Sequence, residues 1–412
     1  MPENFDRISK RIDTYRDESI QIQTRLTAIP AMGPENNGQG EREKAEYVKS
    51  YLQENLSSGN VTEINAPDKR VGDGYRPNLI VKFKGKSDKR TIWIMSHLDV
   101  VDPGDRKLWT SDPFKVMEKD GKLYGRGTED NQQAIVSSLL AVRALQEENV
   151  TPACDIGLAI VADEEAGSVY GIQHVLKTNP ELFRKDDLII IPDAGVEDGT
   201  MIEVAEKSIL WIKCHIRGKQ THGSSPEKGI NAHRAGAHLI VKMDELNRLY
   251  NQKDEIFDPP VSTFEPTKKE ANVPNVNTIP GEDVFYFDCR ILPVYDLAEI
   301  KKQIQKWADE VEEAFGVKIT FSFEHDLSAP PPTPADAPVA VALKKAVQEV
   351  SGKEAKSMGI GGGTVAAYFR QAGLPAVCWA TIDDMAHEPD EYCVINSMLT
   401  DAKVFAHVFM QE

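Results

Sequence analysis

The alternation of strand-like and helix-like segments is the feature that most constrains how this chain folds. Short apolar or β-branched runs are separated by helical patterns at 131–147 and 169–178, and these runs lie at 78–84, 91–96, 155–162 and 187–192. The alternation resumes beyond a proline-rich connector at 329–338, with strand patterns at 355–358 and 375–380. Strands that alternate with helices predict an α/β layer with a mostly parallel sheet.

A different rhythm interrupts this alternation between residues 207 and 325. The segment predicts strands and helices in the order β-α-β-β-α-β, with strands at 208–218, 273–279, 283–292 and 317–324. That order is typical of a ferredoxin-like split βαβ unit. A chain of 412 residues also exceeds what one hydrophobic core usually serves. We therefore expect a catalytic domain formed by 1–206 and 326–412, with a ferredoxin-like lid or dimerisation domain inserted at 207–325.

Charge and composition exclude several classes of partner. The net charge of −17 argues against nucleic acid or an anionic membrane surface, because little basic surface is left to neutralise phosphates. No apolar run approaches the roughly 20 residues of a membrane span, and the first residues are too charged for a signal peptide. Five scattered cysteines without CxxC spacing indicate reduced thiols, so a cytoplasmic location is expected.

Polar side chains stand just past the ends of the predicted strands. Each of five strand ends is followed by histidine or acidic residues, and these are His97 with Asp99, Asp130, Glu164 with Glu165, Asp193, and His387. Open α/β sheets build their sites at the carboxyl ends of strands, so these side chains should meet at one edge.

Each of these residues alone has an ordinary structural explanation, but their convergence does not. A strand-end histidine is often a structural residue, and an aspartate there often caps the next helix. Several carboxylates gathered in one crevice would repel one another and raise at least one pKa. Arg126 is the one basic residue within these stretches. A pair of divalent metal ions resolves the conflict.

The donor types narrow the choice of metal and suggest further roles. Imidazole and carboxylate ligands without thiolate suit catalytic Zn²⁺, with Co²⁺ and Mn²⁺ as alternatives. Asp99 is spaced to orient the imidazole of His97. Of the adjacent Glu164 and Glu165, one can bind metal while the other serves as general base.

Other chemistries find little support in the motifs. In "GRGTED" the last glycine of a dinucleotide-binding fingerprint is replaced by Asp130, and "GIGGGT" (359–364) lacks the lysine of a phosphate-binding loop. The second motif leaves two interpretations open: a turn whose backbone N–H groups bind a carboxylate, or a simple tight turn. The chain has no GxSxG motif, and no cysteine adjoins a histidine in a strand-end context.

Taken in order, the motifs resemble those of a known family. The segments are "MSHLDVV", "YGRGTEDNQQ", "ADEEAGS", "PDAG", "THGSSPEKGINA", "NVNTIPG", "FDCRI", "GIGGGT" and "AHEPDE". They resemble the co-catalytic metallohydrolases that include acetylornithine deacetylase, succinyl-diaminopimelate desuccinylase, aminoacylase and carboxypeptidase G. The resemblance covers roughly residues 10–410.

The resemblance implies a ligand set and a base. His97 and Asp193 would bind one metal, Glu165 and His387 would bind the other, and Asp130 would bridge both. The peptide bond that follows Asp130 is expected to be cis. Glu164 would be the general base, acting on water between the metals.

The resemblance also implies residues that contact the substrate. His222, in the inserted domain, would reach the active site of a neighbouring subunit and stabilise the oxyanion, so a homodimer is expected. The substrate-binding positions would be Asn277, Arg290, Gly361, Gly362, Gly363 and Thr364. Two departures bear on the substrate: Thr364-Val365 stands where many members have Thr-Asp or Thr-Ser, and "EDNQQ" replaces the commoner "DMKGG".

Three functions follow as expectations. The first is a hydrolase that removes an acetyl or succinyl group from a small N-acyl amino acid. The second is a dipeptidase or carboxypeptidase-type peptidase, again acting on a small substrate with a free carboxylate. The third is a catalytically inactive, metal-bound binder of small molecules, against which the presence of Glu164 argues.

Overall fold

The computed structural model describes residues 4–57 and 59–411, which form two compact units. Unit 1 comprises Met1–Val204, Thr333–Ser357 and Thr364–Glu412, and unit 2 comprises Ala205–Pro332 and Met358–Gly363. Relative to the expected boundaries, residues 326–332 and the glycine segment 358–363 group with the inserted unit. Within the motif "GIGGGT", residues 359–363 therefore belong to unit 2, and Thr364 belongs to unit 1.

An eight-stranded sheet forms the centre of unit 1. Its strand order is β1 (Asn60–Glu63), β4 (Leu79–Phe83), β8 (Cys154–Val161), β5 (Ser87–His97), β9 (Leu188–Gly195), β18 (Ala376–Ala380), β10 (Met201–Glu206) and β17 (Lys356–Ile360). Strands β8, β5, β9 and β18 pair in parallel, as the alternation predicts. Strands β1, β4 and β10 pair antiparallel, so the whole sheet is mixed around a parallel centre.

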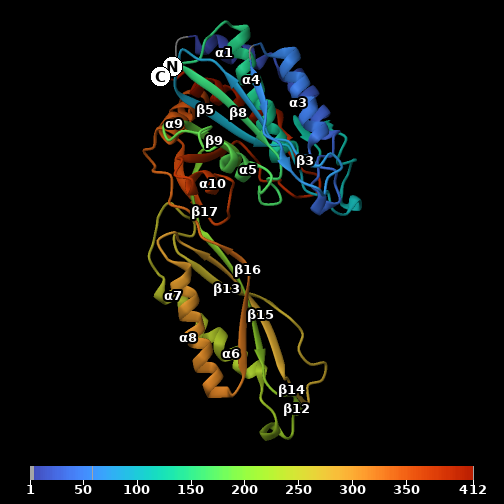
Figure 1. Ribbon diagram of the computed structural model, residues 1–412, viewed down its shortest axis with the longest axis vertical. Helices are drawn as coiled ribbons and strands as arrows, with labels where there is room; N and C mark the ends of the chain where they lie inside the picture. The colour runs from blue at the N-terminus through green and yellow to red at the C-terminus, as the bar shows by residue number, and fades with distance from the viewer. Residues whose placement is uncertain (1–3, 58, 412) are drawn as a thin grey trace. The chain divides into compact units, whose positions relative to one another are not determined.

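Helices cover the sheet on both faces. Successive side chains of β5 point to opposite faces, and all of them are buried from Thr91 to His97, which requires cover on both sides. Trp93 and Met95 pack into a core with residues of α5 and α10. Helices α4 and α9 contact β5 and β9, and α11 packs against both helices (Figure 1). The helices of this unit are α1 (Phe5–Asp13), α2 (Arg16–Thr27), α3 (Arg42–Asn55), α4 (Gln133–Glu147), α5 (Ile172–Thr178), α9 (Pro338–Ser351), α10 (Ala366–Gln371) and α11 (Ile395–Phe409).

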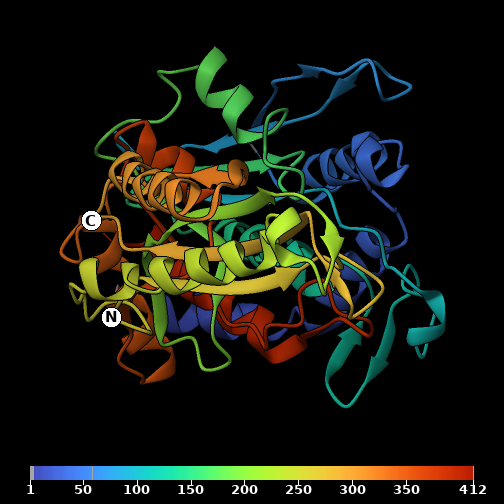
Figure 2. The same cartoon turned by 90° about the horizontal axis from the view of Figure 1, so that it is seen from below.

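The first and last helices of the chain lie side by side in unit 1 (Figures 1 and 2). The ring of Phe5 in α1 meets the ring of His407 in α11 edge to face, with 4.9 Å between centroids. Two smaller sheets complete the unit, one formed by β19 (Tyr392–Val394), β7 (Lys122–Tyr124) and β6 (Met117–Lys119), the other by β2 (Ala66–Pro67) and β3 (Tyr75–Arg76).

Unit 2 has the ferredoxin-like order predicted from the sequence. Its sheet runs β13 (Thr263–Lys269), β15 (Glu282–Ile291), β11 (Ser208–Arg217), β16 (Lys318–Leu327), with all neighbours antiparallel. Helices α6 (Ala232–Met243) and α8 (Leu297–Phe315) pack side by side, and both contribute to one core with the sheet (Figure 1). The short helix α7 (Leu246–Leu249) follows α6. The alternating burial of β11 and β15 explains this one-sided core.

One predicted strand of unit 2 is wrong. The expected strand at 273–279 is mostly loop, and only β14 (Thr278–Ile279) pairs there, with β12 (Thr221–His222) in a separate small sheet. The second sheet strand is instead β13, whose sequence carries Pro266 and two lysines. Because β13 lies at the edge of the sheet, it tolerates a proline and solvent-facing lysines.

The cysteines of the chain are reduced, as expected from their scattered spacing. All five cysteines are free and buried. Within residues 4–57 and 59–411, no helix has both the length and the apolar character needed to cross a membrane.

A buried carboxylate in α11 makes stability depend on pH. Burial raises the pKa of Asp401 to about 7, although Thr381 N (3.1 Å) and Gln133 Nε2 (3.2 Å) donate to its carboxylate. The unfolded chain ionises this group near pH 3.9, so its contribution to stability is lost as the pH rises from about 4 to 7. We expect the free energy of unfolding of Asp401→Asn to increase, relative to that of the natural protein, by about 1.4 kcal/mol for each pH unit in that window.

This expectation can be checked by denaturant unfolding of both metal-free proteins at several pH values. The difference in unfolding free energy should flatten above about pH 7, where the folded protein is itself ionised. A difference that does not change with pH would show that the carboxyl is not held neutral by burial.

Candidate metal centre

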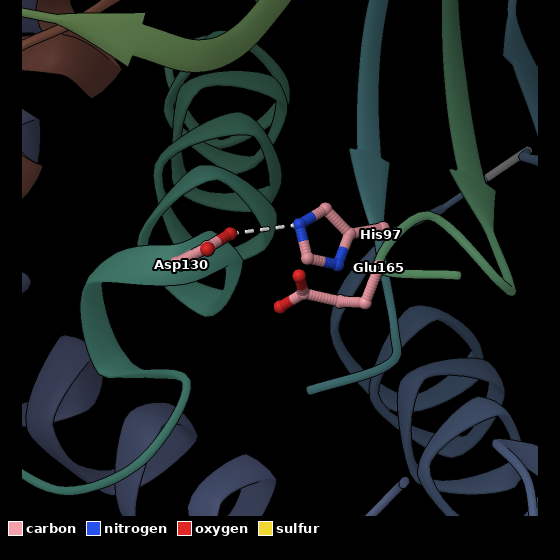
Figure 3. A group of neighbouring side chains, drawn as sticks. All are labelled: His97, Asp130 and Glu165. Atoms are coloured by element: carbon pink, nitrogen blue, oxygen red, sulfur yellow. Dashed lines mark hydrogen bonds and ion pairs between the residues drawn. The ribbon is translucent and has the colours of Figure 1, made fainter. Parts of the chain in front are cut away.

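The imidazole of His97 lies at the carboxyl end of β5 and is fixed from behind. It is almost fully buried, and its Nδ1 lies 3.1 Å from the main-chain oxygen of Asp99 and 3.5 Å from Asp99 Oδ1. Its Nε2 therefore faces the cluster, 2.9 Å from Asp130 Oδ1 (Figure 3). Asp99 lies beside this ring, as expected, but the closer partner of Nδ1 is its main-chain oxygen.

Asp130 presents its two carboxylate oxygens to two different histidines. It lies in the turn η3 (Thr128–Gln132) that leads into α4, and the peptide bond from Asp130 to Asn131 is cis, as the resemblance implies. Its Oδ1 faces His97, while its Oδ2 lies 3.4 Å from His387 Nε2. One carboxylate oxygen of Asp130 thus faces each histidine.

Glu164 and Glu165 follow β8 and are held by Asp99. The Asp99 carboxylate accepts the main-chain N–H of Glu164 through Oδ1 and that of Glu165 through Oδ2, both at 3.0 Å. The two glutamate side chains then diverge. Glu165 Oε2 lies 2.9 Å from His387 Nε2, whereas Glu164 Oε2 lies 3.9 Å from His97 Nε2. Asp99 thus positions both glutamates as well as His97.

Asp193 completes the cluster from β9, and Asn131 holds it in place. Asp193 Oδ1 lies 3.4 Å from His97 Nε2 and accepts a hydrogen bond from Asn131 Nδ2 at 2.8 Å. Asn131 Nδ2 also donates to the oxygen of Pro192 at 2.7 Å, and its Oδ1 accepts from His97 N at 3.3 Å. One amide therefore ties together the ends of β5 and β9, a role that the sequence pattern did not reveal.

These side chains form two overlapping groups that could each hold a metal ion. One group is His97, Asp130 and Glu165, and the other is His97, Glu164 and Asp193. In each group the potential ligand atoms lie within 4.8 Å of one another. The donors are imidazole and carboxylate only, the set preferred in catalytic sites for borderline divalent metals.

The carboxylates of the cluster repel one another, which raises the pKa of two of them. Burial raises the pKa of Glu164 well above its ordinary value, and the nearby Asp193, Glu165 and Asp130 carboxylates raise it further. Burial likewise raises the pKa of Glu165 to about 7, with Asp130 adding to the shift.

The pKa values of the two histidines rise as well, because the carboxylates around them favour the charged form of the ring. Although burial lowers the pKa of His97, hydrogen bonds to Asp130, Asp193 and Asp99 raise it well above the ordinary value. The pKa of His387, which is 57 % exposed, rises to about 10 because it hydrogen-bonds to Asp130 and Glu165.

No lysine or arginine supplies the missing charge. Across residues 4–57 and 59–411, the ion pairs made by the carboxylates of Asp130, Glu164, Glu165 and Asp193 involve only His97 and His387. Without cations, these shifts favour protonated histidines and neutral carboxyl groups. Divalent cations would make both unnecessary, so the donor set fits a metal centre.

The predicted residues of unit 2 fall into two groups. His222 in β12 and Asn277 beside β14 lie at the same small two-stranded sheet, where Gly223 N donates to the Asn277 oxygen at 2.6 Å. The exposed His222 ring meets Ser224, with Nδ1 2.7 Å from Ser224 Oγ.

Arg290 in β15 makes the second group with the glycine segment. Its guanidinium pairs with both oxygens of Asp288, at 2.7 and 3.0 Å, and donates to the Gly361 oxygen at 2.9 Å. Gly361 and Gly362 have open space where a side chain would begin. Thr364 belongs to unit 1, where its Oγ1 accepts from Ala366 N at 3.2 Å.

Comparison with known proteins places this geometry in a family. The sequence pattern of peptidase family M20/M25/M40 matches residues 93–411, most of the chain. An uncharacterized metallohydrolase of Methanocaldococcus jannaschii is 40% identical over 412 residues, which cover 95% of this chain and 98% of that protein. A succinyl-diaminopimelate desuccinylase of Nitratiruptor sp. is 24% identical over 376 residues, 91% of this chain and 94% of that enzyme.

A solved structure shares the fold. The crystal structure of human carnosine dipeptidase 1 superposes with a TM-score of 0.72 at 21% identity, covering 99% of this chain and 98% of that one. The family match spans the strand ends that carry His97, Asp130, Glu165, Asp193 and His387. The chain is therefore a member of peptidase family M20/M25/M40 and a hydrolase of amide or peptide bonds.

Proposed function

We propose that this protein is a metal-dependent hydrolase that removes the acyl group from a small N-acyl amino acid. The observation that carries the proposal is Asp130, whose two oxygens face two histidines from opposite ends of one cluster. Around it stand enough carboxylates for two divalent ions and one further acid to act as base.

The ligands divide into two sets about Asp130. His97 and Asp193 would hold one ion, and Glu165 and His387 would hold the other, consistent with the 3.4 Å and 2.9 Å approaches within each pair. Zn²⁺ is our first choice of metal, with Co²⁺ and Mn²⁺ as alternatives that suit the same donors. Ions held there would supply Lewis-acid chemistry, polarising a substrate carbonyl and acidifying a water molecule.

Glu164 is left free to move the proton. In this assignment its carboxylate takes a proton from the attacking water and delivers it to the leaving amine. Its Oε2 lies 3.9 Å from His97 Nε2, at the edge of the cluster rather than in hydrogen-bond contact with either histidine. His222 would stabilise the oxyanion from a neighbouring subunit.

The substrate class follows from the residues assigned to bind it. Arg290 and the Gly361–Thr364 segment would recognise a free carboxylate, while Asn277 would bind near His222. The guanidinium already pairs with Asp288, which presents it in a fixed orientation. The similarity to a desuccinylase over 91% of this chain favours an acetyl- or succinyl-amino acid.

A dipeptidase is the second candidate, because the fold is shared with human carnosine dipeptidase 1. A panel of N-acetyl and N-succinyl amino acids, dipeptides and their carboxyl-amidated analogues, assayed with Zn²⁺, Co²⁺ and Mn²⁺, separates the two. The N-acyl amino acids should give the highest kcat/KM, and amidation should lower it. Faster turnover of dipeptides would favour the second candidate, and no turnover of any compound would contradict both.

We further propose a cytoplasmic homodimer formed through unit 2. Strands β13 and β16 are the edges of its sheet, and an exposed edge can continue across a two-fold axis. A sedimentation-velocity experiment that shows only monomers would remove the proposed role of His222 in a neighbouring site.

A further inference from the structure

Two loops that carry proposed ligands brace each other through buried carboxylates. One is the turn 125–131, which carries Asp130, and the other is the segment 381–391 between β18 and β19, which carries His387. Each loop contributes a glutamate whose side chain accepts main-chain N–H groups of the other. We call this pair of contacts, made by Glu129 and Glu391, the glutamate clamp.

Glu391 holds the turn that carries Asp130. It is fully buried, and its Oε1 accepts from the main-chain N–H groups of Glu129 (3.0 Å) and Asp130 (3.1 Å). Its Oε2 accepts from Gly127 N at 2.8 Å and from Arg126 Nη1 at 2.7 Å. One carboxylate thus fixes three main-chain donors of the turn, including that of Asp130 itself.

Glu129 makes the converse contact. It is 5% exposed, and its two oxygens accept from Asp383 N (2.7 Å) and Met385 N (2.5 Å), which lie four and two residues before His387 in the chain. Arg126 closes the arrangement, because its Nη2 donates to the His387 main-chain oxygen at 3.3 Å. The loop is therefore held both at the residues that precede His387 and at the main chain of His387 itself.

The clamp fixes the separation of Asp130 and His387 more directly than the sheet does. His97 and Asp193 lie on strands β5 and β9, which pair with each other, whereas Asp130 and His387 lie on loops. The 3.4 Å approach of Asp130 Oδ2 to His387 Nε2 therefore depends on contacts between those loops. Buried carboxylates that satisfy several backbone donors are costly to replace, which suits them to this task.

We propose that Glu129 and Glu391 are positioning residues that set the affinity for one of the two metal ions, the one held by Glu165 and His387. The inference rests on the dinuclear centre proposed above. Changes in groups that orient metal ligands typically cost 10- to 100-fold in metal affinity. The other ion shares Asp130, but its remaining ligands His97 and Asp193 stand on paired strands, so its affinity should fall much less.

The test is a Zn²⁺ titration of the chelator-treated full-length chain and of Glu129→Gln and Glu391→Gln. Glutamine keeps the side-chain size but turns one acceptor into a donor that faces a main-chain N–H. Each variant should bind one ion about as tightly as the natural protein and the other about 10- to 100-fold more weakly. Glu129→Gln is the milder variant, because within residues 4–57 and 59–411 the Glu129 carboxylate accepts from main-chain N–H groups and pairs with no arginine.

Glu203→Gln is the matched control. Glu203 is also a fully buried carboxylate of unit 1, but among the described residues its side chain hydrogen-bonds to Arg370, bidentately at 2.8 and 2.7 Å, and not to the two loops. Its replacement should lower the melting temperature and leave both affinities within about threefold. The visible spectrum of the Co²⁺-loaded proteins gives a second readout of ligand geometry, which a general loss of stability would not alter.

The outcomes are distinct. If the natural protein binds two ions and both clamp variants bind them with the same affinities, the clamp proposal is overturned. It is also overturned if Glu203→Gln loses as much zinc affinity as the clamp variants do. A natural protein that binds fewer than two ions would overturn the dinuclear function, and the clamp with it. Selective weakening of one ion in both clamp variants would support the proposal.

Discussion

Replacing Glu164 by glutamine should reduce kcat by about 100- to 10,000-fold, the usual contribution of a general base. Glutamine has nearly the same shape but cannot accept and return a proton, so the loss should fall on the chemical step. KM and the content of bound metal should change little, because the proposed ligands are other residues. Steady-state kinetics together with metal analysis of the same sample measure all three quantities.

The control for this variant is Glu197→Gln, an exposed glutamate of the same unit beyond the end of β9. It should keep natural activity, since it is not part of the cluster. If Glu164→Gln instead loses metal, then Glu164 is a ligand, as its grouping with His97 and Asp193 would allow. If it keeps full activity, the base must be sought elsewhere.

Replacing Asp130 by asparagine should lower the affinity of the protein for both metal ions at once. Asparagine has one neutral oxygen where the carboxylate has two charged ones, and those two face His97 and His387 separately. Since changes in supporting groups alone cost about 10- to 100-fold, loss of the shared ligand should exceed about 100-fold for each ion. Zinc titration of the chelator-treated protein measures both affinities, and turnover should vanish at zinc concentrations that saturate the natural protein.

The comparison variant for Asp130→Asn is His387→Ala. His387 is proposed as a ligand of one ion only, so its loss should leave the ion held by His97 and Asp193 in place. Two bound ions of natural affinity in Asp130→Asn would contradict the bridging role. Loss of a single ion there would mean that Asp130 belongs to one set alone.

The sequence predicts which side chains gather at the proposed metal centre, because these side chains follow predicted strands. His97, Asp130, Glu164, Glu165, Asp193 and His387 all follow predicted strands, and the structure gathers them at one edge of the large sheet. The α/β class and the inserted ferredoxin-like unit were also predictable, since both follow from element order. The rule that sites form at carboxyl ends of strands carries most of this success.

The supporting residues were not predictable in the same way. Asn131, Glu129 and Glu391 act on main-chain groups of distant segments, and their partners lie up to 264 positions away. A glutamate that accepts backbone N–H groups looks in sequence like any solvated acid. The one available sign was the departure "EDNQQ", which placed an extra acid and an amide beside Asp130.

The misplaced strand of unit 2 has a related cause. The segment 273–279 carries two valines and an isoleucine among polar residues and a proline, and Val276 is fully exposed there. The true strand β13 buries only Phe264 of its seven residues. An edge strand needs few apolar side chains, so its pattern is weak until its neighbours are known.

The central claim is that two divalent cations gather these carboxylates and histidines. Anomalous diffraction from crystals of the zinc-loaded protein, recorded at the zinc edge, tests it most directly. We predict two peaks about 3.5–4 Å apart on either side of the Asp130 carboxylate, one beside His97 and Asp193 and the other beside Glu165 and His387. A single peak, or peaks that do not contact Asp130, would contradict the account.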